Sequence, residues 1–257
     1  MIKKSPSKNQ EPRIWETELL RLTGFPSAAS KIEGQTWWKD IAGAVPETRK
    51  EKPNKGELQE SGQFSGGRLI LQIQPTRIDW VHSAIEDPDS DMKFPSLGSF
   101  PNSLDRFLKS MLTWLNSASC PQMQRLALGA VLLQPVKDIR EAYIKLSSYL
   151  GIDVDPNSTD FLYQINRPKD CSAEVAGLKI NRLTKWSSAS LQLLEVQLDG
   201  SSSKQREVGN AQFFCRLELD ISSNTDFPGD LPQRQLPRIF ELSADLGKKL
   251  AAKGYNS

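Results

Sequence analysis

The stretch Phe213-Phe214-Cys215-Arg216-Leu217-Glu218-Leu219-Asp220-Ile221 alternates apolar and charged side chains almost without interruption. Successive side chains of a β-strand point to opposite faces of a sheet, so this stretch predicts a strand with one apolar and one charged face. The charged face would carry Arg216, Glu218 and Asp220. Antiparallel sheets often leave one face to water, and the stretch therefore favours an antiparallel sheet that is covered on one side only.

The rest of the chain extends this prediction. A hairpin is expected from residues 69–74 and 77–81 around Pro75-Thr76, and further strands are expected at 126–133, 161–166, 178–186 and 191–198. Helical periodicity appears at 104–115, at 136–150 before Gly151, and from about 237 to Gly254. We therefore predict an α+β fold, an antiparallel β-sheet with helices packed on one face and a C-terminal helix.

The N-terminal part reads as a helical appendage. Residues 1–12 are polar and basic, Ile14, Trp15, Leu19 and Leu22 resemble one helical stripe, and Trp37, Trp38 and Ile41 resemble another. Residues 44–67 are polar and glycine-rich, as linkers are. We expect residues 1–56 to form a flexible basic arm with two short tryptophan-bearing helices and a linker, and residues 57–257 to form the main α+β domain.

Composition limits the possible functions. The chain has 257 residues and a formal net charge of +2, which is weak for a dedicated nucleic-acid-binding protein. No apolar run approaches the roughly 18 residues that span a bilayer, and the N-terminus lacks the apolar core of a signal peptide. Three isolated cysteines fit a reducing compartment. We expect a cytoplasmic protein without a membrane partner.

Few residues offer catalytic chemistry. The one histidine, His82, is expected to be an ordinary solvated or hydrogen-bonded side chain, and the chain lacks phosphate-binding glycine loops and Cys/His zinc motifs. No cofactor is expected. One alternative uses carboxylates: Asp79, Glu218 and Asp220 could hold a magnesium ion in a metal-dependent phosphodiesterase or nuclease.

The charged sheet face is the main candidate binding site. Its side chains Arg216, Glu218 and Asp220 could pair with Arg182 or Lys179 on a neighbouring strand. A second alternative is single-stranded nucleic-acid binding by basic side chains with Trp80 and Trp186 as stacking platforms. The basic side chains concerned are Arg77, Arg125, Arg167, Arg182, Lys185 and Arg216.

Five stretches together carry a family resemblance: LILQIQPTRIDW (69–80), GAVLLQP (129–135), FLYQIN (161–166), INRLTKW (180–186) and CRLELDI (215–221). With the terminal helix they resemble, over about residues 60–254, a sporadically distributed family of uncharacterised bacterial proteins. In those proteins an antiparallel sheet ends in an apolar strand with an aspartate before a last helix. The patchy distribution implies mobile genes, such as defence or toxin-neutralising operons.

We therefore expect a non-enzymatic interaction or accessory protein of a bacterial cytoplasmic system, with a protein partner. The expected binding residues are the polar sheet side chains Arg182, Arg216, Glu218 and Asp220 and the three N-terminal tryptophans, Trp15, Trp37 and Trp38. Aromatic side chains outside a core are frequent interface anchors, which motivates the second set. The sequence does not predict an oligomeric state.

Overall fold

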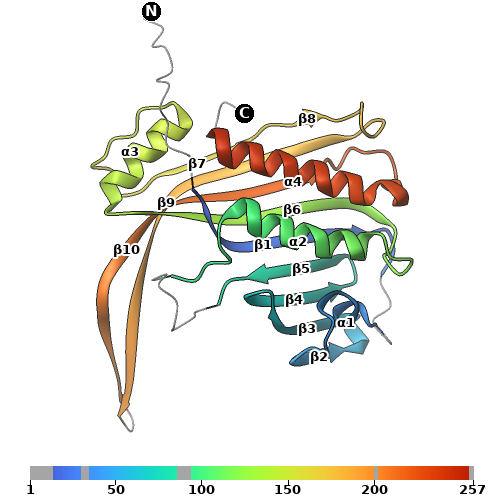
Figure 1. Ribbon diagram of the computed structural model, residues 1–257, viewed down its shortest axis with the longest axis horizontal. Helices are drawn as coiled ribbons and strands as arrows, with labels where there is room; N and C mark the ends of the chain where they lie inside the picture. Colours follow the sequence, from blue (N-terminus) through green and yellow to red (C-terminus); the bar gives the residue numbers. More distant parts are fainter. Residues whose placement is uncertain (1–13, 30–34, 86–93, 200–201, 255–257) are drawn as a thin grey trace, which may run out of the picture.

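The computed structural model describes residues 14–29, 35–85, 94–199 and 202–254, and of residues 193–199 and 202–210 it describes the backbone alone. The described chain forms one antiparallel sheet and a set of helices (Figure 1). The strands are β1 (Glu16–Pro26), β2 (Thr48–Lys52), β3 (Glu57–Phe64), β4 (Gly67–Gln74), β5 (Arg77–Ser83), β6 (Met123–Val136), β7 (Leu162–Asn166), β8 (Lys169–Asp170), β9 (Lys179–Asp199) and β10 (Ser202–Ser223). The α-helices are α1 (Trp37–Ala42), α2 (Phe100–Leu115), α3 (Ile139–Leu150) and α4 (Leu236–Lys253), and short 3-10 turns form at Pro53–Lys55 and Gln233–Gln235.

The strand order across the sheet is β2-β3-β4-β5-β1-β6-β10-β9-β7, with β8 also paired to β9. Neighbours along the chain are mostly neighbours in the sheet, as expected for strands joined by tight turns. One exception is β10, which pairs with β6 and β9, so that β7 and β8 follow β6 in the chain but pair with β9 in the sheet. The other is β1, which lies between β5 and β6 and pairs antiparallel with both. The first strand of the chain therefore joins the two halves of the sheet.

All four helices cover the same face of the sheet, and the core lies between them. The apolar side of β10, from Cys215 to Ile221, is fully buried there. Helix α4 approaches this side closely, because a Cβ atom at Gly247 would lie 3.3 Å from the Ile221 side chain. The predicted α+β fold, with an antiparallel sheet, helices on one face and a C-terminal helix, is confirmed.

The predicted helix near residues 14–24 is wrong, because these residues form the central strand β1. Two features disguise the strand in the sequence. Leu19 lies on the uncovered face while Leu20 and Leu22 lie in the core, so both faces carry apolar residues. A register shift between Thr17 and Leu19 also interrupts the two-residue period. The second expected N-terminal helix is confirmed as α1, which ends at Gly43.

The predicted linker at 44–67 is also wrong. It contains β2 and β3, which pair with each other, and β3 pairs with β4. Strand β2 is exposed and rich in Lys, Arg and Glu, which is a common way to protect a sheet edge and gives a linker-like sequence. The predicted domain boundary at 56/57 falls inside this hairpin, and the described residues before it contribute β1 and β2 to the sheet, so they are not a separate appendage. The flexible basic arm expected at residues 1–12 lies outside the described residues.

The two strands expected at 178–186 and 191–198 are one strand, β9, and β10 begins earlier than expected. Their hairpin extends beyond the rest of the sheet (Figure 1, lower left). None of the helices among the described residues is both long and apolar enough to cross a membrane.

Candidate binding face of the sheet

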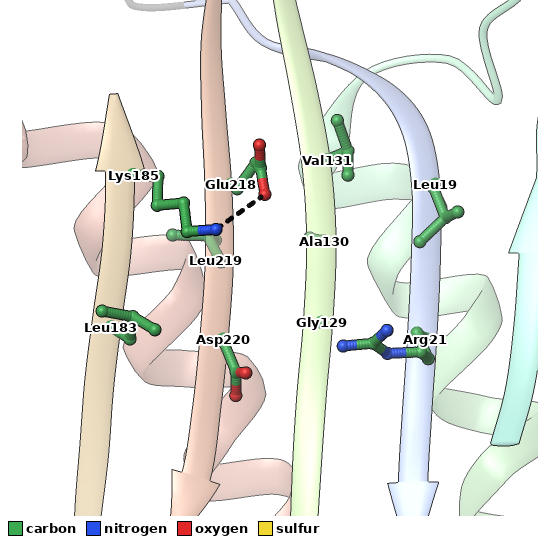
Figure 2. Close-up of a pocket in the computed structure, with 10 residues that line it drawn as sticks. All are labelled: Leu19, Arg21, Gly129, Ala130, Val131, Leu183, Lys185, Glu218, Leu219 and Asp220. Carbon is green, nitrogen blue, oxygen red and sulfur yellow. Dashed lines mark ion pairs between the residues drawn. The ribbon is translucent and has the colours of Figure 1, made fainter. Parts of the chain in front are cut away.

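The face of the sheet that is turned away from the helices is called the open face here. Its central part is formed by neighbouring side chains from four strands (Figure 2). They are Leu19 and Arg21 of β1, Gly129 and Val131 of β6, Glu218 and Asp220 of β10, and Leu183 and Lys185 of β9. They surround a hollow of about 270 Å³, which we call the polar hollow.

One row across the polar hollow consists of Arg21, Gly129 and Asp220, which are paired directly in the register of β1, β6 and β10. Gly129 leaves its position empty, and the guanidinium of Arg21 lies over it, pointing across β6 toward Asp220 (Figure 2). A Cβ atom at Gly129 would lie 3.2 Å from Nε and 3.3 Å from Nη2 of Arg21. The glycine is therefore what allows Arg21 to lie flat across the neighbouring strand.

Arg21 and Asp220 face each other without forming an ion pair; Figure 2 draws none between them. Nε of Arg21 and Oδ1 of Asp220 are both buried, and neither has a hydrogen-bond partner within the described part of the chain. A buried polar atom without a partner is unfavourable by about 1–3 kcal/mol. This row therefore holds a donor and an acceptor that are both unsatisfied.

The adjacent row is satisfied internally. Glu218 lies within 3.9 Å of the Lys185 ammonium across the strand pair and also accepts a hydrogen bond from Arg216 of its own strand. The expectation that Arg216, Glu218 and Asp220 share a charged face is met. The expected partner Arg182 is wrong, because it pairs in register with the buried Ile221 and so lies on the helix side, with its Nε bonded to the Arg167 carbonyl.

A second hollow of about 320 Å³ lies further along the same strands, and we call it the apolar hollow. Its centre is a small apolar cluster of Phe94, Leu133 and Phe214, in which the two phenyl rings are 4.8 Å apart. Leu19 lines both this hollow and the polar hollow, so the two are adjacent. Arg216 lies on its rim.

Sequence reasoning missed most of these residues. Arg21 and Gly129 were overlooked because the first strand was taken for a helix and 126–133 for a uniformly apolar run. Phe214 carried a usable signal, since it falls in the same alternation as Arg216 and Glu218 and so had to share their face. Phe94 follows an acidic, proline-bearing loop and gave no such signal.

The three carboxylates considered for a metal site are not brought together. Asp79 lies on β5, and β1 and β6 separate that strand from β10, which places it about 14 Å from Glu218 and Asp220 at ~4.8 Å per strand. The carboxylate of Asp79 is also occupied, accepting hydrogen bonds from Arg77 and Thr23 at 2.6 Å each. Among the described residues no three His, Cys, Asp or Glu side chains are grouped to hold an ion. The magnesium-dependent alternative is not supported by this geometry.

The three N-terminal tryptophans are core residues, so their predicted role as exposed anchors is wrong. Trp15, Trp37 and Trp38 are each at most 2% exposed. Trp15 donates from Nε1 to the Ala251 carbonyl of α4, and Trp37 donates to Ser119. Trp15 immediately precedes the central strand β1, and Trp37 and Trp38 belong to α1, so all three are buried where these segments pack into the core.

The nucleic-acid alternative loses its aromatic component. Trp80 and Trp186 are at most 1% exposed and lie in the core, where they cannot stack on bases. The basic side chains on the open face are interleaved with carboxylates: Arg77 binds Asp79, and Arg216 and Lys185 both contact Glu218. Such a surface presents no continuous positive track for a phosphate backbone.

The histidine and the cysteines are not arranged for catalysis. His82 is buried and its Nε2–H donates to the Phe64 carbonyl at 2.9 Å, as the expectation of a hydrogen-bonded side chain allowed. Burial lowers the pKa of His82 and raises the pKa of Cys120 and Cys215 to about 12. A thiol with so high a pKa is not a nucleophile at neutral pH.

The comparisons with known proteins add no function to this geometry: the chain matches no protein-family model and no curated protein sequence.

Proposed function

We propose that the protein is a non-enzymatic binding protein that docks a partner protein on the open face of its sheet. The observation that carries the proposal is the pair of hollows at the centre of that face. One is lined by the apolar cluster of Phe94, Leu133 and Phe214, whose side chains are at most 9% exposed, and the other contains two charged groups with unsatisfied buried atoms. The unsatisfied atoms are unfavourable unless a ligand supplies their partners.

The composition of the open face suits a protein partner. Apolar side chains such as Leu19, Val131 and Leu183 lie among charges of both signs. Protein interfaces have this character, an apolar centre with polar groups around it. A nucleic acid would instead require an excess of positive charge. The resemblance stated above supports a setting in a bacterial cytoplasm, as an accessory protein of a mobile defence or toxin-neutralising operon.

The proposal is tested by crosslinking from two faces of the molecule. A photo-crosslinking amino acid is introduced at Val131, in the polar hollow, or at Lys109, which is exposed on α2 on the helix side. In cells of the natural source, we expect a specific protein adduct from position 131 and none from position 109. The adduct partner, once purified, should bind the wild-type protein directly.

A second variant separates docking from folding. Val131→Arg fills the polar hollow with a cation and should weaken binding of that partner by about a hundredfold, since it would bury an unpaired charge in the interface. Its thermal unfolding midpoint should stay close to that of wild type, because Val131 lies outside the core. An adduct that forms equally from both positions, or binding that survives Val131→Arg, would contradict the proposal.

A further inference from the structure

We propose that the open face binds an extended segment of the partner, with a large apolar side chain in the apolar hollow and a primary amide side chain, Asn or Gln, between Arg21 and Asp220. This inference rests on the proposed function and specifies which segment of the partner protein the open face would bind. It follows from the shape of the two hollows and from the hydrogen-bonding capacity of the two charged groups.

The geometry favours an extended segment. The two hollows are adjacent, share Leu19 as a lining residue and lie along the same strands. Phe214 in one hollow and Asp220 in the other are six positions apart on β10, which corresponds to about 20 Å at ~3.4 Å per residue. An extended peptide has almost the same rise per residue, so its apolar and amide side chains should also be about six residues apart.

The chemistry between Arg21 and Asp220 selects a primary amide. A guanidinium only donates hydrogen bonds, and an ionised carboxylate only accepts them. A primary amide carries an acceptor oxygen and a donor NH2 on one carbon, so it can satisfy both groups at once. A carboxylate in the same place would be repelled by Asp220, and an ammonium by Arg21.

The neighbouring charges do not change this selection. Glu218 already contacts the cations Lys185 and Arg216, so this part of the hollow needs no further charge. The polar hollow as a whole has two cations, Arg21 and Lys185, facing two anions, Glu218 and Asp220. A neutral ligand that both donates and accepts is therefore the complementary one.

Gly129 sets the position of the Arg21 guanidinium. Because this position has no side chain, the guanidinium lies over β6 and points toward Asp220, as Figure 2 shows. A methyl group there would contact Nε and Nη2 of Arg21 at 3.2–3.3 Å and displace the guanidinium. Gly129→Ala should thus weaken the site by moving Arg21, although it removes no hydrogen-bonding group.

The competing explanation is that Arg21 and Asp220 close on each other as an ordinary ion pair in solution. In that case no ligand is needed to satisfy them, and substituting either one should affect stability rather than binding. The experiment below distinguishes the two explanations.

The test is selection from a displayed library of random peptides of about 12 residues on the purified full-length protein. We expect enrichment of sequences with Phe, Trp, Leu or Met about six residues from Asn or Gln. The best peptide is then synthesised with a fluorophore, and its dissociation constant is measured by fluorescence anisotropy. Replacing its amide residue by Glu or by Leu should each weaken binding about tenfold or more, the loss expected when buried polar groups lose their partner.

Variants of the protein provide the other half of the test. Asp220→Ala, Arg21→Ala, Gly129→Ala and Phe214→Ala should each weaken the peptide about tenfold, and Lys109→Ala on the helix side should leave it unchanged. Thermal unfolding midpoints check that each variant is folded. The inference is overturned if no peptide is enriched, if the enriched peptides lack the apolar and amide pair, or if Asp220→Ala and Arg21→Ala bind them as wild type does.

The outcomes also separate this inference from the proposed function. If crosslinking from Val131 identifies a partner while no peptide is enriched, the partner docks through a folded surface, and the extended-segment inference fails while the proposed function stands. If peptides bind as described while the crosslinking gives no partner adduct, the site is real and the proposed role of a docked protein partner fails.

Discussion

Trp15 provides the sharpest test of how the N-terminal segment is built into the fold. It precedes β1, is 2% exposed, and lies with its ring centre 5.8 Å from that of Tyr149 and 6.0 Å from that of Trp186. Its Nε1–H donates to the Ala251 carbonyl at 3.0 Å. That carbonyl belongs to the last turn of α4, where carbonyls have no partner within the helix. One side chain thus connects the central strand, α3, α4 and β9.

The expected magnitudes follow from these contacts. Removing a buried tryptophan side chain costs about 3–5 kcal/mol, so Trp15→Ala should lower the free energy of unfolding by about 4 kcal/mol. Trp15→Phe keeps an aromatic ring in the core but removes the indole donor and leaves the Ala251 carbonyl without a partner. The expected loss is about 1–2 kcal/mol. The neighbouring Ile14 is 60% exposed, so Ile14→Ala should stay within about 0.5 kcal/mol of wild type.

The assay is equilibrium unfolding in urea, followed by far-UV circular dichroism so that the removed fluorophore does not bias the signal. Three variants are compared under the same conditions, and the order expected is Trp15→Ala well below Trp15→Phe, with Ile14→Ala level with wild type. Equal stability of Trp15→Ala and Ile14→Ala would refute the reasoning, because it would mean that the segment before β1 is not part of the core.

Three further predictions concern buried groups. Because burial lowers the pKa of His82, this side chain takes up a proton in the unfolded chain first as pH falls. The contribution of His82 to the free energy of unfolding should therefore be constant above pH ~6.5 and fall below it, and His82→Gln, measured at pH 7.5 and 5.5, should lack this component. A pH dependence that is the same in both proteins would contradict the assignment. The thiols of Cys120, Cys171 and Cys215 are buried, so the folded protein should react with a disulfide reagent at pH 8 far more slowly than the urea-unfolded protein does. Equally fast reaction of both would contradict this prediction. Gly67→Ala places a Cβ atom 2.6 Å from the Ser83 carbonyl oxygen and should destabilise the protein by about 1–3 kcal/mol in the urea assay. Gln63→Ala on the exposed side of β3 should have little effect. Equal effects of the two substitutions would argue against tight packing around Gly67.

Several elements from residue 67 onward were predictable because they are periodic and end in clear signals. The helix of residues 139–150 has regular apolar spacing and ends at Gly151, whose positive φ of 67° is the expected left-handed cap. The hairpin of β4 and β5 turns at Pro75-Thr76, as the sequence indicates. In these places local propensity and tertiary packing favour the same structure.

Strands β1 and β2 were not predictable, because their local sequence patterns resemble structures other than the ones that they form. Strand β1 is apolar on both faces and is interrupted by a register shift, so its pattern resembles a short helix. Edge strand β2 consists of charged residues that protect it from further pairing and therefore resembles a linker. In both cases the position in the sheet decides the structure, and that position is a non-local property.

The candidate site was predicted only in part, again for a non-local reason. Alternation within β10 correctly placed Glu218 and Asp220 on one face. It could not reveal that Arg21, about 200 residues away in the sequence, would lie across Gly129 from Asp220, because that depends on β1 entering between β5 and β6. Because of the same insertion, β1 and β6 both lie between β5, which carries Asp79, and β10, and the carboxylates considered for a metal site are separated.

The position of β1 also has a consequence for biosynthesis. Emerging from the ribosome, β1 can pair on one side with β5 as soon as residue 83 is available, but its other edge must wait for β6, which ends at Val136. Until then the nascent chain presents an unpaired edge next to Leu20 and Leu22, the type of surface that recruits chaperones or aggregates. Translational pausing between residues 83 and 123 should therefore lower the yield of native protein more than pausing after residue 136.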